Sequence, residues 1–166
     1  KCYDDGKWDI RDGWLVADAR TTTSRSILWL NRPLPNDIRI ECEAECVDQA
    51  RDLTFIIAGN GHTYSGYEIV IGGSENKRVV LFKCTKETSP TEVKRLARDD
   101  FSLMKDRTYT IRIRKYRAAI TVSVNDEALL SSSDEQPLDD AHHRYFGFAS
   151  RGNVVRFDSL RIEERK

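Results

Sequence analysis

Three carboxylates, Glu41, Glu43 and Glu45, alternate along one short segment of the chain. The segment, residues 38–47, reads IRIECEAECV. Apolar and charged residues alternate in it, which is the pattern of a β-strand with one buried face, so the three glutamates are expected on the same face. Two carboxyl groups that flank a glycosidic bond can cleave it when their surroundings drive their pKa values apart. The three glutamates of this segment are therefore candidates for such chemistry.

Ion pairing is the alternative explanation of these glutamates. Arginines alternate in the same way at Arg112 and Arg114, and Arg156 and Arg161 lie in a further strand-like segment. Opposite charges that face each other across neighbouring strands stabilise a sheet modestly, and alternating charge is usual on a solvated sheet face. We favour this explanation. Glutamates that face arginines on an open sheet would exclude the catalytic hypothesis.

A second candidate site lies in residues 59–73, which read GNGHTYSGYEIVIGG. The segment offers four side chains suited to a sugar, namely His62, Tyr64, Tyr67 and Glu68. Exposed aromatic rings pack on the apolar faces of sugars, while imidazole and carboxylate groups bind hydroxyls. The alternative, which we favour, is a glycine-rich hairpin with Tyr67 in the core, because glycine and asparagine commonly build turns.

The elements that would position these residues are short β-strands, because the dominant period of the sequence is two. Turn signals such as Asp12-Gly13 and Asn125-Asp126 separate them. About twelve short strands with such spacing indicate an all-β sandwich or barrel. The expected strands are residues 8–10, 14–17, 26–30, 38–47, 53–58, 67–71, 78–83, 109–115, 118–124, 127–131, 145–150 and 154–162.

Length and charge limit the function classes. The chain has 166 residues, with 27 Lys and Arg against 27 Asp and Glu, so its formal net charge is zero. A length of this size predicts a single domain over residues 1–166. The zero balance argues against a nucleic-acid partner, and no apolar run approaches the ~20 residues of a membrane-spanning helix.

The four cysteines are Cys2, Cys42, Cys46 and Cys84. No pair has the spacing of a zinc or redox motif. Cys42 and Cys46 lie too far apart along one strand to form a disulfide with each other. We expect them to be buried thiols, and bridges Cys2–Cys84 and Cys42–Cys84 stay open as alternatives.

Several segments, in order along the chain, carry a family resemblance. They are residues 8–16 (WDIRDGWLV), 66–73 (GYEIVIGG), 109–125 (YTIRIRKYRAAITVSVN) and 145–162, which contain YFGFAS and VRFDSLRI. This pattern resembles that of concanavalin A-like, laminin-G-like domains, and is similar to bacterial 3-keto-glycoside hydrolase-like domains. The resemblance implies a jelly-roll sandwich of two antiparallel sheets with about twelve strands.

The resemblance also implies roles for single residues. The 41–45 segment is similar to the E-x-D-x-E strand of jelly-roll glucanases, in which Glu41 would be the nucleophile and Glu45 the acid/base. It departs from that pattern because its middle acid is Glu43 rather than aspartate. Glu68 would lie in the ligand cleft. Related jelly rolls often hold one structural calcium ion, for which Asp158, or an aspartate at position 4 or 5, would be the candidate; the alternative is that no metal or cofactor is bound, with Asp158 in a turn or ion pair.

The function that these features favour is a non-catalytic binding module for carbohydrate, acting through the concave sheet and its rim loops. One alternative is a glycoside hydrolase-like enzyme that uses paired glutamates. A second is a protein-interaction or scaffold domain with no glycan site. The resemblance implies an extracellular or periplasmic location, with a cytoplasmic one left open. The identity of the sugar and the oligomeric state are left open as well.

Overall fold

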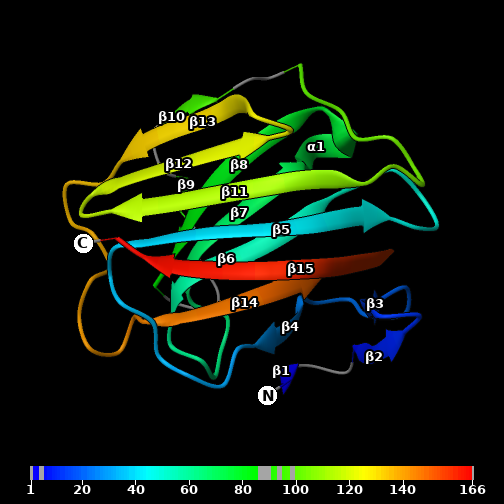
Figure 1. Ribbon diagram of the computed structural model, residues 1–166, viewed down its shortest axis with the longest axis horizontal. Helices are drawn as coiled ribbons and strands as arrows, with labels where there is room; N and C mark the ends of the chain where they lie inside the picture. The colour runs from blue at the N-terminus through cyan, green and yellow to red at the C-terminus, as the bar shows by residue number, and fades with distance from the viewer. Residues whose placement is uncertain (1, 4–5, 86–90, 93–94, 98–99, 166) are drawn as a thin grey trace.

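The computed structural model describes residues 2–3, 6–85, 91–92, 95–97 and 100–165. They form two stacked antiparallel β-sheets, of which the eight-stranded sheet faces the viewer in Figure 1 and the seven-stranded sheet lies behind it. The expected all-β jelly roll of two antiparallel sheets is confirmed. Within this part of the chain, no helix is long and apolar enough to cross a membrane.

Segments that are distant in sequence pair within both sheets. The twelve strands of four or more residues match the number expected. The seven-stranded sheet runs in the order β1 (Cys2–Tyr3), β4 (Ser26–Trp29), β14 (Tyr145–Ser150), β6 (Leu53–Gly59), β7 (Gly66–Gly72), β8 (Arg78–Cys84) and β9 (Thr91–Glu92). The eight-stranded sheet runs in the order β10 (Arg95–Ala97), β13 (Glu127–Ser133), β12 (Ala119–Val124), β11 (Tyr109–Tyr116), β5 (Ile38–Cys46), β15 (Val154–Glu164), β3 (Trp14–Asp18) and β2 (Lys7–Arg11).

The main core lies between the two sheets and is formed by alternate residues of their strands. Its centre is aromatic, because the rings of Phe148 and Phe157 stack with centroids 4.3 Å apart and Phe55 contacts both edge-on. Each buried ring of this kind stabilises the fold by about 1.5–3 kcal/mol. These contacts join β6 and β14 of one sheet to β15 of the other.

Three cysteines are buried and free, as the sequence predicted for two of them. Burial raises the pKa of Cys42 to about 12, and it raises the pKa values of Cys46 and Cys84 to about 11. The alternative bridges from Cys84 are wrong, because both Cys42 and Cys84 are free thiols. These thiols therefore act as small apolar side chains.

The seven-stranded sheet is buried on its outward face as well. Every residue of β6 and β7 is buried, so these strands lack the alternation of burial that β5 shows. A second apolar cluster covers part of this face, and Tyr64 and Tyr145 pack against it. The members of the cluster are Ile27, Trp29, Ile56 and Ala149. Polar residues on this face, such as Glu68, are thus held away from water.

A left-handed turn, labelled α1 (Gly73–Asn76), joins β7 to β8. Ser74, Glu75 and Asn76 have positive φ values of 51°, 60° and 64°, a conformation that costs residues with a Cβ about 1–2 kcal/mol each. The Asn76 amide holds the turn in place, since it accepts from the Leu103 N–H and donates to the Leu103 carbonyl, both at 2.7 Å.

Lys115 points into the sandwich at the end of β11, where the alternation of the strand places it, and it is 2% exposed. Its ammonium donates to the carbonyl of Asn36 at 3.3 Å. Burial lowers the pKa of Lys115, and the charges of Asp37 and Asp139 oppose that effect. A desolvated ammonium with so few partners destabilises the folded state.

We expect Lys115→Met to raise the free energy of unfolding at pH 7 by about 1 kcal/mol, because the variant removes a desolvated charge and keeps the apolar stem. The folded-state pKa of Lys115 is lowered, so the penalty is complete below that pKa and shrinks as the pH rises through it. The difference in free energy of unfolding between Lys115→Met and the wild type should therefore decrease as the pH approaches ~10. Urea unfolding at several pH values measures both effects, with Arg114→Met on the exposed face as the control. A wild type more stable than Lys115→Met at pH 7 would contradict this account.

Replacement of Glu75 by glycine should relieve strain in the left-handed turn. Glu75 has an 87% exposed side chain, so the change removes little packing. Glycine adopts positive φ without the steric cost, and we expect the free energy of unfolding to rise by about 0.5–1 kcal/mol. Lys77→Gly is the matched control, since Lys77 has an ordinary φ of −120° and should lose stability instead. Equal losses in both variants, measured by urea unfolding, would argue against strain at Glu75.

Candidate functional site

A pocket of about 320 Å³ opens on the outward face of the seven-stranded sheet. Its floor is apolar and comes from Val70 of β7 and from Val80 and Phe82 of β8, with Val70 and Val80 directly opposite each other in the ladder. Phe82 is only partly buried, so its ring is accessible in the pocket. The charged residues of the rim are Arg25, Arg51, Asp52, Glu75 and Arg151.

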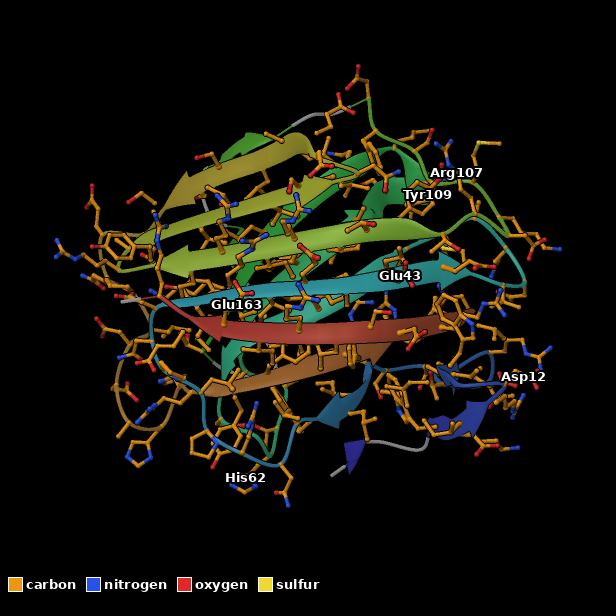
Figure 2. All side chains as sticks on the ribbon, in the orientation of Figure 1. Asp12, Glu43, His62, Arg107, Tyr109 and Glu163 are labelled. Atoms are coloured by element: carbon orange, nitrogen blue, oxygen red, sulfur yellow. The ribbon has the colours of Figure 1, made fainter. Side chains whose placement is uncertain are left out.

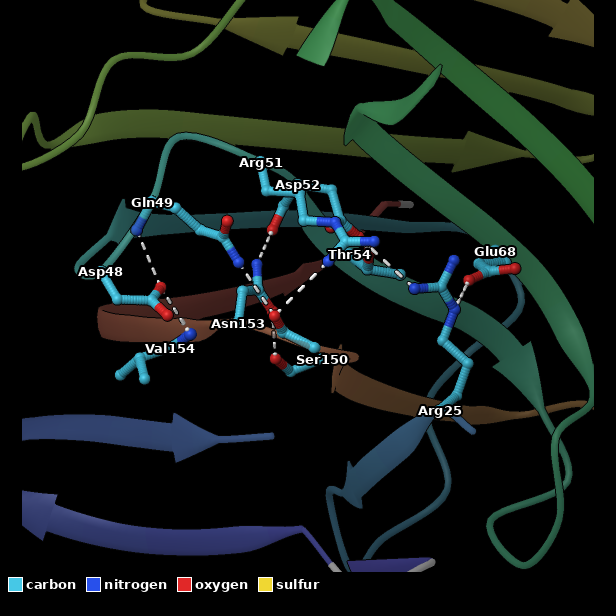
Figure 3. Close-up of polar contacts among 11 residues, drawn as sticks. Arg25, Asp48, Gln49, Arg51, Asp52, Thr54, Glu68, Ser150, Asn153 and Val154 are labelled. Carbon is cyan, nitrogen blue, oxygen red and sulfur yellow. Dashed lines mark hydrogen bonds and ion pairs between the residues drawn. The ribbon is translucent and has the colours of Figure 1, made fainter. Parts of the chain in front are cut away.

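One wall of the pocket is formed by Arg25, which makes an ion pair with the buried Glu68, as drawn in Figure 3. Glu68 is 1% exposed. The Arg25 guanidinium binds one of its carboxylate oxygens, and the Tyr64 hydroxyl donates to the other. Burial, and next the charge of Glu68, raise the pKa of Tyr64, so this phenol stays protonated as the donor. Glu68 thus orients Arg25 and Tyr64.

Asp52 connects this wall to the end of β6. Its carboxylate accepts from the Thr54 hydroxyl at 2.9 Å and lies 3.4 Å from the Arg25 guanidinium. Its backbone carbonyl accepts from the Asn153 amide at 3.0 Å, and Asn153 in turn accepts from the Ser150 hydroxyl at 2.7 Å. Figure 3 shows how these contacts tie the segment before β6 to the end of β14. The rim is therefore fixed by groups that are themselves buried.

Gly72 lets the chain turn tightly at the pocket. Its φ is +84°, and a Cβ at this position would lie 2.2 Å from the carbonyl oxygen of Arg51. Only glycine fits so close to another backbone. The approach brings the left-handed turn with Ser74 and Glu75 to the same rim as Arg51.

The structure separates the four residues of 59–73 that the sequence singled out. Tyr64 and Glu68 meet beneath the pocket wall, as described above. His62 lies exposed on the loop between β6 and β7, at the lower edge of Figure 2, where Asn60 accepts from its backbone N–H. Tyr67 is fully buried in the core between the sheets, where its hydroxyl donates to Asp134 at 2.6 Å and accepts from the Leu138 N–H. Tyr67 therefore lies on the opposite side of the sheet from the pocket.

The carboxylates of β5 lie on the outward face of the other sheet and contact arginines. Glu41 accepts from Arg112 and from Arg39, and the hydrogen bond from Arg112 lowers the pKa of Glu41. Glu45 accepts from Arg156 at 2.8 Å and from the Thr108 hydroxyl at 3.1 Å. A glycosidase needs one carboxyl whose pKa is raised so that it can donate a proton. These contacts instead hold Glu41 ionised and occupy both oxygens of Glu45.

Glu43, between them, is labelled on the viewer-facing sheet in Figure 2 and accepts from the Ser159 hydroxyl at 3.3 Å. Asp158 faces Glu43 across the ladder at a bulge of β15, is exposed, and accepts from the Ser159 N–H at 2.7 Å. Among the residues that the structure describes, no three His, Cys, Asp or Glu side chains cluster as metal ligands would. The aspartates at positions 4 and 5, the other calcium candidates, lie outside the described residues.

Sequence reasoning missed most of the pocket. Arg25, Arg51 and Arg151 each lie in a loop within two residues of a strand, and a single arginine in a loop carries no pattern. The sequence places Phe82 in an expected strand and indicates no function for it. The signal that could have found it is the continuous apolar run VVLF in residues 79–82, which indicates burial or contact on both faces of the strand.

No protein-family model matches the chain, and no curated protein matches it in sequence. Solved structures match it in fold. Carbohydrate-binding module CBM66 from Bacillus subtilis superposes with a TM-score of 0.79 at 12% identity, covering 96% of this chain and 92% of that one. A Bacillus subtilis protein of unknown function with a galectin-like fold gives 0.73 at 14% identity, covering 98% and 89%.

A third structure is the exoplasmic/lumenal domain of VIP36, in a form bound to Ca²⁺ and Man3GlcNAc. It superposes with a TM-score of 0.71 at 11% identity, covering 99% of this chain and 84% of that one. At these identities the similarity concerns the fold. The chain therefore has the jelly-roll sandwich fold of these structures.

Proposed function

We propose that this protein is a non-catalytic carbohydrate-binding module whose site is the pocket on the outward face of the seven-stranded sheet. The observation that carries the proposal is the composition of this pocket. An accessible aromatic ring and two valines form its floor, and charged side chains held by a buried network form its rim.

This composition suits the two surfaces of a sugar. A pyranose or furanose ring presents C–H groups on one face, which pack on an aromatic side chain such as Phe82. Its hydroxyls need donors and acceptors in fixed positions, which Arg25, Asp52 and Ser74 offer at the rim. Because Arg25 and Asp52 are already oriented by their partners, little conformational entropy is lost when a ligand binds.

The solved structures of similar fold support the proposal, since they include a carbohydrate-binding module and a lectin domain with a bound oligosaccharide. The carboxylates of β5 support a non-catalytic function, because arginines occupy Glu41 and Glu45. The remaining candidate, a protein-interaction domain, has no comparable feature in its favour and becomes an outcome of the tests below.

A screen of the purified domain against immobilised glycans, followed by calorimetry on the best ligand, tests the site. We expect Phe82→Ala to weaken binding about tenfold, since loss of ring stacking costs roughly 1 kcal/mol or more. Tyr116→Ala is the matched control, because Tyr116 is a partly exposed aromatic residue of the other sheet and should leave affinity unchanged. No binding to any glycan would favour the protein-interaction domain, and equal effects of the two variants would place the site elsewhere.

Removal of calcium should leave binding intact. The only carboxylates that line the pocket among the described residues are Asp52, paired with Arg25, and Glu75, paired with Lys77. A cation at the pocket would have to displace these partners. We therefore expect equal affinity in a chelator and in added calcium, as measured by calorimetry. A loss of affinity in the chelator would instead support a structural ion, for which Asp158 is the candidate.

A further inference from the structure

We propose that the sugar this pocket recognises carries an anionic group, a carboxylate or a sulfate, which Arg51 and Arg151 bind at the mouth. The inference rests on the proposed function and adds the chemical class of the ligand. Three arginines line the pocket, and they differ in how far carboxylates within the protein already bind them.

Arg25 is not the anion receptor, because its charge is already used. Its guanidinium binds the buried Glu68 and lies 3.4 Å from Asp52, and its side chain is only 15% exposed. A further anion would compete with two carboxylates for the same donors. Arg25 therefore acts as a wall of the pocket.

Arg51 stands at the mouth with weak contacts only. Its side chain is 47% exposed, its Nε lies 3.9 Å from Asp52, and its Nη1 donates to the carbonyl of Gly152 at 3.4 Å. The Asp52 carboxylate is shared with Arg25 and Thr54. Arg51 is thus held near the mouth while most of its five donors are left for a ligand.

Arg151 is exposed on the same rim, and no carboxylate of the described residues pairs with it. It follows β14 directly, next to Gly152, whose carbonyl holds Arg51. The Arg51 guanidinium therefore lies against the backbone of the residue that follows Arg151, and both arginines line the pocket. Planar forks of this kind match the oxygens of a carboxylate or sulfate and bind them with charge-assisted hydrogen bonds.

The charge at this end of the pocket is positive although the whole chain is neutral. Arg25 is shared between the Glu68 and Asp52 carboxylates, and Glu75 lies 3.5 Å from the Lys77 ammonium with its side chain 87% exposed. With Arg51 and Arg151 included, four cationic groups face three carboxylates, which leaves an excess of one positive charge. An acidic sugar whose ring packs on Phe82 would place its anionic substituent against Arg51 and Arg151.

A glycan array with neutral, uronate-containing, sialylated and sulfated oligosaccharides tests the inference. We expect the bound set to be anionic and the best ligand to lose at least about tenfold in affinity when its acid is reduced or desulfated. Arg151→Gln should cause a similar loss, whereas Arg114→Gln, an exposed arginine on the other sheet, should cause none. Binding should also weaken several-fold as salt rises from about 50 to 500 mM. The carboxylated and sulfated arms show which anion is preferred.

Two results would overturn the inference, and they differ in what they say of the proposed function. If neutral glycans bind as tightly as acidic ones, and Phe82→Ala weakens binding while Arg151→Gln does not, the anionic preference is wrong and the sugar site stands. If no glycan binds at all, both proposals fail.

Discussion

The buried ion pair between Arg25 and Glu68 is the interaction on which the candidate site depends. Glu68 lies in the middle of a strand that is buried on both faces, where an unpaired carboxylate would cost several kcal/mol. Arg25 forms an ion pair with one of its oxygens, and the Tyr64 hydroxyl donates to the other. The pairing places Arg25, which directly precedes β4, over the outward face of the sheet, and so fixes the position of this pocket wall. The ion pair also places Arg25 near Asp52, so the positions of both rim side chains are fixed by buried contacts.

The two outward faces of the sandwich use charge differently. On the eight-stranded sheet, glutamates of β5 face arginines of β11 and β15. Glu41 and Arg112 are partly exposed, so their pair stabilises the sheet modestly, whereas Glu45 is buried. On the seven-stranded sheet, apolar and aromatic residues cover one end and charged groups surround a pocket at the other. On the first face, the glutamates and arginines pair with each other. The second leaves Phe82 and two guanidiniums accessible.

The strands were predictable because alternation is a local signal, as residues 38–47 show, and the ion pairing of Glu41 and Glu45 was predicted as the favoured alternative. The pocket was not predictable, because Arg25, Arg51 and Arg151 are brought together only by the order of β4, β6 and β14 in the sheet. Tyr67 illustrates the same limit. Its neighbours in sequence left a sugar contact open beside the favoured core position, and strand alternation places it in the core while Glu68 turns outward. Which face a strand residue occupies depends on partners that the local sequence does not contain.

The central claim is that a glycan binds on the outward face of β7 and β8. Backbone amide NMR of the isotope-labelled domain, titrated with the best ligand from a glycan array, tests it most directly. A glycan bound in the pocket should cause the largest chemical-shift changes at Val70, Val80 and Phe82 and at the turn after Gly72. Changes confined to β5 and β11, or to the loop that carries His62, would contradict the claim.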